Sequence, residues 1–337
     1  MLALPGEGLK PATRKRASDC LAPSDSAREH DYEQDYANEC EYQHNVDEEL
    51  LCDWIEATVL FHEPSLSGAE LVDLLTEQQY YTEQASAWQL FDMLYFRLQQ
   101  RAQVLGEGYP LKLTHRLIES RGAWQEFLPY SFCLTLSLAK PFAGWAAGFG
   151  TSYTEQGALF EQLSARSLGL ILPGWSIYRT GWAATHATKL KDIVRRLAIS
   201  IGATVGNLDD WVPEKTKDAE LDLACVREFP DPRGGHCTFL TQCASGKNWS
   251  SKLHTPNLAL WSKLINFTVP PDRCFTIPYT LPEKEFRIST LKVQGLFLDR
   301  LRLLTPGRAS RDWIPRDLSV EIERWVAGRL RSLPKRR

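Results

Sequence analysis

Four polar residues stand at matching ends of two short apolar runs and could together hydrolyse a phosphodiester bond. The first run, "LDLACVREF", contains Asp222 and follows Glu220, and the second, "HCTFLTQCA", contains Gln242 and is followed by Lys247. Carboxylate and amide oxygens are ligands that Mg²⁺ or Mn²⁺ accepts, with water and phosphate oxygens filling the remaining positions. A lysine within reach can stabilise developing negative charge or help to deprotonate the attacking water. These residue types therefore predict a metal-dependent hydrolysis site.

The two runs flank the turn "PDPRGG" and are expected to pair as an antiparallel hairpin. A register that is symmetric about the turn places Asp222 beside Gln242 and Glu220 beside Ala244. Because side chains alternate along a strand, these four residues would share one polar-tipped face, and the opposite face would be packed. A second interpretation is open, in which Glu220 and Asp222 are exposed edge charges and Gln242 and Lys247 begin an ordinary loop.

The elements around this hairpin predict a mixed α/β architecture. Helical spacing of apolar residues runs from about residue 48 to 126, and from residue 151 the pattern reads helix, strand, helix, strand, strand, helix, strand. Such an order predicts a sheet with helices on both sides. The expected organisation is a flexible polar arm at 1–45, an α-helical region at 46–150, an α/β domain at 151–290 and a helical, basic extension at 291–337.

The order Asp, strand, turn, strand, Gln and Lys resembles the core of the PD-(D/E)XK restriction-endonuclease-like superfamily. It is most similar to the Mrr-like branch, in which Gln replaces the carboxylate of the second motif. The resemblance covers roughly residues 150–285 and implies a mixed central sheet flanked by helices, with an acidic residue on the preceding helix. "GALFEQLSARSL" supplies that residue as Glu161. One position departs from the family, because Ala244 stands where the lysine is expected, so that Lys247 is the natural substitute and Lys252 the reserve.

The resemblance implies a Mg²⁺- or Mn²⁺-dependent endonuclease that cleaves DNA, in restriction or antiviral defence. The alternative is a catalytically silent module that keeps the fold and binds DNA or protein, which Ala244 favours. By resemblance, Asp222, Glu161 and Gln242 would hold the metal, with Glu220 and Asp218 as additional candidates, and Lys247 or Lys252 would be the catalytic lysine.

Charge is unevenly distributed along the chain. Residues 1–150 contain 11 basic and 23 acidic residues, a net charge of −12, whereas residues 151–337 contain 28 basic and 19 acidic residues, a net charge of +9. A basic C-terminal half suits an anionic partner such as DNA, and the acidic helical region could dock a protein partner. Four basic residues at helical spacing could grip DNA phosphates or form an ordinary solvated face: Lys189, Lys191, Arg195 and Arg196.

The remaining features favour a cytoplasmic protein without a membrane span. The eight cysteines show neither a CxxC pair nor zinc-site spacing, so they are expected to be reduced thiols. The first residues lack the apolar core of a secretory signal, and the most apolar window, 127–150, is interrupted by Lys140 and Pro141. A homodimer is compatible with cleavage of both DNA strands, which needs two active sites.

Overall fold

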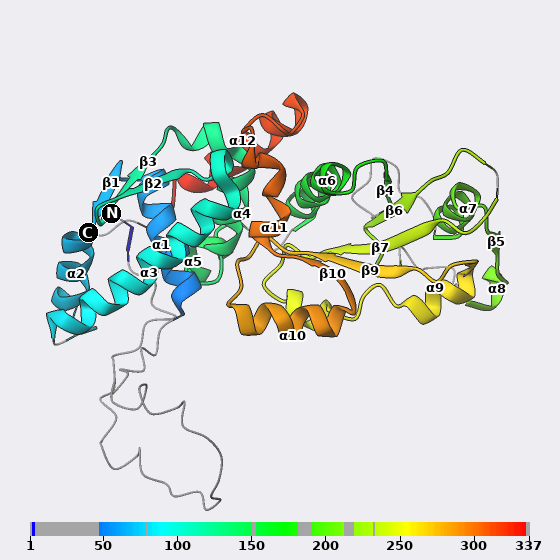
Figure 1. Cartoon of the computed structure of the whole chain (residues 1–337), viewed down its shortest axis with the longest axis horizontal. Helices are drawn as coiled ribbons and strands as arrows, with labels where there is room; N and C mark the ends of the chain where they lie inside the picture. The colour runs from blue at the N-terminus through cyan, green and yellow to red at the C-terminus, as the bar shows by residue number, and fades with distance from the viewer. Residues whose placement is uncertain are drawn as a thin grey trace, which may run out of the picture.

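The computed structural model describes residues 2–3, 47–78, 80–81, 83–149, 153–180, 190–211, 219–231 and 233–334. The chain forms two parts along its longest axis, one mainly helical and one built on a five-stranded sheet (Figure 1). The predicted polar arm lies outside the described residues, except for its second and third residues. Leu2 is fully buried, and Trp54 Nε1 donates a hydrogen bond to the Ala3 carbonyl at 2.9 Å. These two residues are therefore held against the helical part.

Two helices of the first part, α1 and α2, begin where side chains satisfy backbone N–H groups. The Asp47 carboxylate accepts a hydrogen bond from Leu50 N at 3.1 Å, and Ser67 and Glu70 form a reciprocal capping box. The expected helices are present as α1 (Glu48–Phe61), α2 (Gly68–Glu77), α3 (Gln84–Leu105), α4 (Leu128–Ser137) and α5 (Ala143–Ala147). Helical spacing did not predict the small antiparallel sheet of β1 (Ser65–Ser67), β2 (Leu111–Thr114) and β3 (Leu117–Ser120), in the order β1-β3-β2.

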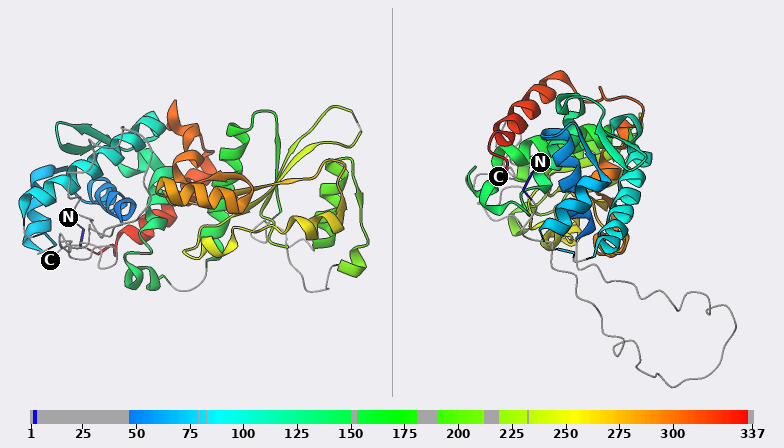
Figure 2. Two further views of the ribbon diagram at one scale, coloured as in Figure 1. Left: turned by 60° about the horizontal axis from the view of Figure 1, so that its bottom comes forward. Right: turned by 90° about the vertical axis from the view of Figure 1, so that its left-hand side faces the viewer.

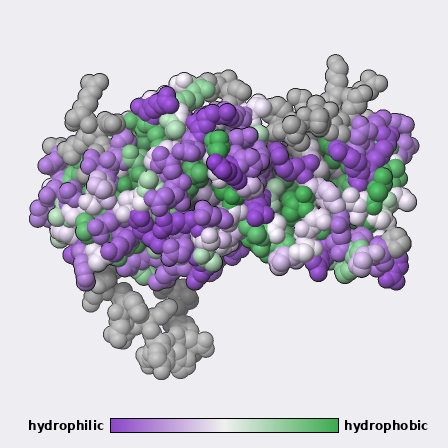
Figure 3. Space-filling view, turned by 90° about the horizontal axis from the view of Figure 1, so that it is seen from above, coloured by the Kyte–Doolittle hydropathy of each residue, from purple (hydrophilic) through white to green (hydrophobic). Residues whose placement is uncertain are grey.

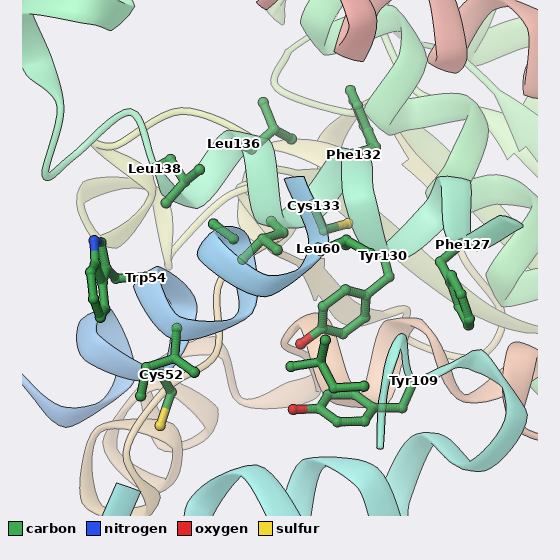
Figure 4. Packing of buried hydrophobic residues seen from close by; sticks show 14 of the residues in the cluster. Cys52, Trp54, Leu60, Tyr109, Phe127, Tyr130, Phe132, Cys133, Leu136 and Leu138 are labelled. Atoms are coloured by element: carbon green, nitrogen blue, oxygen red, sulfur yellow. The ribbon is translucent and has the colours of Figure 1, made fainter. Parts of the chain in front are cut away.

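The core of the helical part is rich in aromatic residues. The rings of Tyr109 and Tyr130 meet edge to face with centroids 5.6 Å apart (Figure 4). Helix α12 (Arg316–Leu330) returns from the C-terminal end and packs on α4, where Trp325 lies 5.0 Å from Phe132 between ring centroids. Residues at the two ends of the chain also meet, since Ala3 N donates to the Pro334 carbonyl at 3.2 Å (Figure 2).

The second part is built on a mixed sheet in the order β10-β9-β7-β6-β4. Strands β4, β6 and β7 are antiparallel neighbours, whereas β7, β9 and β10 run parallel. The predicted mixed α/β class is confirmed, and β10 belongs to this sheet although it lies in the segment taken as an extension. The strands are β4 (Ser176–Arg179), β6 (Leu223–Arg227), β7 (Cys237–Cys243), β9 (Asp272–Thr276) and β10 (Gly295–Leu298). The helices are α6 (Thr154–Ile171), α7 (Leu190–Ser200), α8 (Leu208–Trp211), α9 (Leu258–Leu264), α10 (Glu283–Val293) and α11 (Arg300–Leu303), and β5 (Thr204–Val205) pairs with β8 (Ile265–Asn266).

Both faces of this sheet are covered. Leu223 and Cys225 pack with apolar residues of α6 in a core that is continuous with the helical part. Ala224, Val226 and Leu240 face the other way and pack with α7 and α9. The prediction of one packed face and one polar-tipped face is therefore wrong, because both faces are packed. The polar residues at the end of the hairpin interrupt a face that is otherwise buried.

A buried ion cluster joins the two parts. Arg101 of α3, 2% exposed, donates hydrogen bonds of 2.5–2.8 Å to the carboxylates of Glu49, Asp53 and Glu56 in α1. Arg300, at the start of α11, donates to both Asp53 oxygens at 2.9 and 2.8 Å. Burial alone would raise the pKa of Asp53, but Arg300 and Arg101 outweigh burial and hold this pKa at about 2. Since α11 directly follows β10, the cluster ties the large sheet to α1.

The described surface is mostly polar. Seen from above, hydrophilic residues cover most of the visible face, and apolar residues are scattered among them (Figure 3). None of the described helices combines the length and the apolar composition needed to cross a membrane.

Candidate active site

The hairpin has the predicted register. In the β6–β7 ladder Leu223 lies opposite Thr241 and Cys225 opposite Phe239, so that Asp222 and Gln242 meet at the open end. Asp222 N donates to the Thr241 carbonyl at 3.0 Å, and Thr180 N, just beyond β4, donates to the Asp222 carbonyl at 2.9 Å. Both neighbouring strands therefore fix the backbone that carries Asp222.

The Asp222 carboxylate accepts two hydrogen bonds from β7. Gln242 Nε2 donates to Oδ2, and Cys243 N donates to the same oxygen at 2.7 Å. Asp222 is 7% and Gln242 6% exposed, so water screens this contact weakly. The Gln242 side-chain amide must turn its nitrogen toward Asp222, because an ionised carboxylate only accepts hydrogen bonds and Nε2 only donates them. The Gln242 Oε1 atom lies 3.2 Å from the hydroxyl of Thr255, which donates to it.

Glu161 reaches the same region from α6, and Cys243 connects it to Asp222. Burial raises the pKa of the Cys243 thiol well above its usual value, and the nearby negative charges of Asp222 and Glu161 raise it further. The charges of both carboxylates therefore act on this one thiol, although they come from different elements. Glu161 is 4% exposed and forms an ion pair of 3.8 Å with Arg179 Nη2 at the end of β4.

The structure does not continue the ladder to Glu220. Ala219 and Glu220 have φ values of 47° and 60°, and this left-handed backbone ends the extended run before Asp222. Glu220 is exposed and does not lie opposite Ala244 in the described ladder, because strand β6 begins at Leu223. Ala244 is buried, and its N–H donates to the Thr276 carbonyl at 2.9 Å. Asp218 lies outside the described residues.

The two candidate lysines lie in different surroundings. Lys247 is exposed and lines a pocket beside the start of α1, and Asp222, Gln242 and Glu161 do not line that pocket. Lys252 is also exposed, and its carbonyl accepts the N–H of Thr255 at 2.9 Å. Since the Thr255 hydroxyl bonds to Gln242, the backbone of Lys252 is linked to the polar end of the hairpin, and this link does not involve the ammonium group of Lys252.

The basic residues of α7 lie on its exposed side, because the apolar side faces the sheet. Lys191 forms an ion pair with Asp209, and Arg195 pairs with Asp192 at 3.2 Å. Arg196 is exposed and forms no ion pair with any residue that the structure describes, whereas Lys189 lies outside those residues. The pairing of Lys191 and Arg195 favours a solvated face, and Arg196 is the remaining candidate for phosphate contact.

A divalent metal would find few protein ligands here. No group of three or more His, Cys, Asp or Glu side chains that could hold a metal occurs in the described part of the chain. Mg²⁺ commonly binds through one or two carboxylates and completes its shell with water and phosphate oxygens. Asp222 and Glu161 are two buried carboxylates that could supply this small donor set, since the charges of both act on the Cys243 thiol. Gln242 fits less well as a ligand, because its Nε2 is bound to Asp222 and its Oε1 to Thr255.

Three residues of this site were missed from the sequence. Arg179, Cys243 and Thr255 belong to no motif, and each becomes a neighbour of the candidate residues only through folding. An arginine at the end of the strand "SIYR" was the one available signal, because charge at a strand end often faces another charge.

Comparison of this chain with protein-family models, with curated proteins and with solved structures finds no match.

Proposed function

We propose that this chain is a Mg²⁺- or Mn²⁺-dependent nuclease with a PD-(D/E)XK restriction-endonuclease-like core, which hydrolyses phosphodiester bonds in DNA. The observation that carries the proposal is the bonded pair of Asp222 and Gln242 at the open end of the β6–β7 hairpin, together with the buried Glu161 on the preceding helix, whose charge acts on the same Cys243 thiol. The mixed sheet with helices on both faces supports it as well. By resemblance, the biological setting would be restriction or antiviral defence.

The proposed roles follow from the bonding. Asp222 and Glu161 would hold the metal, which when bound would supply a Lewis acid for the phosphate oxygens. Gln242 would act as a positioning residue, because its amide holds the Asp222 carboxylate. Lys252 is the proposed residue to stabilise the negative charge that develops on phosphorus-bound oxygen, because its backbone is linked through Thr255 to Gln242, whereas Lys247 lines a different pocket. The net charge of +9 on residues 151–337 supports an anionic substrate.

The second candidate function is a silent module that binds DNA or a protein. It is favoured by the buried methyl group of Ala244 at the position where the family has a lysine, and by the position of Lys247 at a different pocket.

The test is cleavage of plasmid and single-stranded DNA by the purified full chain with Mg²⁺ or Mn²⁺. We expect D222N and K252M to lower the rate about 100-fold or more, and K247M to change it little. D317N is the matched control, since Asp317 is an exposed acid in the first turn of α12. Cleavage that persists in D222N would refute the assigned site. Absence of cleavage by the wild type, with DNA still retained in a gel-shift assay, would support the silent module.

A further inference from the structure

A pocket of about 380 Å³ lies between the starts of α1 and α10 and is separate from Asp222. The starts of these helices lie near each other in Figure 1, and the pocket is lined from both of them and from the loop that follows β7. Its size falls within the range of about 300–1,000 Å³ that is typical of small-molecule sites.

Most of the charges around the pocket are already paired. Glu48 pairs with Arg97 at 3.2 Å, and Asp47 with Lys140 at 3.4 Å. The two further α1 acids at the pocket belong to the buried cluster with Arg101 and Arg300.

Two charged residues that line the pocket, one basic and one acidic, are not among these pairs. Lys247 and Glu285 form no ion pair or side-chain hydrogen bond within the described ranges. An anionic group suits the ammonium group of Lys247, and a hydrogen-bond donor suits the carboxylate of Glu285. The pocket is thus complementary to a ligand that carries both an anionic group and a hydrogen-bond donor.

A buried hydroxyl group points independently to a ligand. Thr280 lines the pocket and is only 8% exposed, yet its Oγ1 has no hydrogen-bond partner among the described atoms. A buried polar group without a partner costs about 1–3 kcal/mol, so a ligand gains affinity if the Thr280 hydroxyl, which is closed to solvent in the unliganded chain, turns toward the pocket and bonds to it. Trp249 and Tyr279 also line the pocket, with ring centroids 6.5 Å apart and planes inclined by 29°, and they offer aromatic surface to a flat ring.

We propose that this pocket binds a mononucleotide whose base carries an amino group. Lys247 receives the phosphate, the base lies against Trp249 and Tyr279, and its amino group donates to Glu285 or Thr280. The residues involved are distinct from Asp222, Glu161 and Lys252, so this site does not depend on the nuclease proposal.

The test is calorimetric titration of the full chain with AMP, CMP, GMP and UMP, and with IMP, which has a carbonyl in place of the AMP amino group. We expect AMP to bind at one site, and IMP, adenosine, K247M and T280V each to weaken binding about tenfold, the loss expected for one charged or buried hydrogen bond. K292M is the control, because Lys292 is exposed on α10 and does not line the pocket. Unliganded T280V should be at least as stable as the wild type, because valine removes a hydroxyl that has no partner.

Two results would overturn the proposal. One is the absence of binding by all the monophosphates at millimolar concentration. The other is AMP binding that K247M and T280V leave at the wild-type affinity, which would place the nucleotide elsewhere. Equal affinity for AMP and IMP would overturn the assigned contact with the amino group.

Discussion

Replacing Arg300 by methionine should destabilise the protein more than any surface substitution of arginine. Arg300 is fully buried, bonds to both oxygens of Asp53, and donates from Nε to the Pro278 carbonyl at 2.8 Å. Methionine fills part of the volume but leaves Glu49, Asp53 and Glu56 to share the single charge of Arg101. Removing one partner from a buried ion pair costs about 3–5 kcal/mol, because the other charge stays buried without compensation. We expect R300M to lose about that much free energy of unfolding.

The assay is urea denaturation of the full chain at pH 7, with R287M as the control. Arg287 also pairs with a carboxylate, Glu283, at 2.6 Å, but its side chain is 77% exposed. An exposed pair contributes about 0–1 kcal/mol, so R287M should change stability little. In a double-mutant cycle, D53N with R300M should lose less than the sum of the two single losses, by about 1 kcal/mol or more, since the two side chains bond directly.

A loss in R300M as small as that in R287M would refute this reasoning, because it would mean that the cluster contributes no more than surface charge. Additive losses in the double-mutant cycle would also refute it.

Three further outcomes are expected. The depressed pKa of Asp53 gives a contribution to stability that is complete above its unfolded value of 3.8 and is lost as pH falls from about 4 to about 2; the loss is about 2 kcal/mol and is absent in D53N, as urea denaturation at several pH values will show. The raised pKa of the half-buried Cys243 predicts slower alkylation by iodoacetamide than at the exposed Cys237, measured by mass spectrometry at pH 8, and an equal rate would contradict the raised pKa. Substituting Gly295 by alanine places a Cβ atom 2.1 Å from the Arg273 carbonyl oxygen and should cost about 1–3 kcal/mol in a thermal or urea unfolding assay, whereas an unchanged midpoint would show that β9 and β10 can separate freely.

Local patterns were sufficient to predict the hairpin. A short turn joins two strands whose side chains alternate with a period of two, so the pairing of Asp222 with Gln242 follows from counting back from the turn. The same reasoning failed at Glu220, because the left-handed backbone before Asp222 is not encoded by alternation. The order of the longer helices and strands from residue 151 to β9 could also be predicted, since each has its own periodicity of apolar residues, whereas the short elements β5, α8 and β8 were missed.

Contacts between distant segments could not be predicted in this way. The ion cluster pairs Asp53 with Arg300 across 247 positions, and α12 returns to pack on α4 through Trp325. No local pattern specifies which buried charge meets which, because partner choice depends on how whole elements pack.

By itself, the sequence determined the main helices and strands of the second part up to β9, the hairpin register and the residues that could do chemistry there, but not β5, α8, β8 or the membership of β10 in the sheet. Only the tertiary structure decided that the Lys252 backbone is linked through Thr255 to Gln242, that the charges of Glu161 and Asp222 act on the same thiol, and that Lys247 lines a separate pocket. The reason is physical. Hydrogen-bond register and periodicity act over a few residues, whereas the direction of a loop side chain and the neighbours of a buried charge are set by packing between elements far apart in the chain.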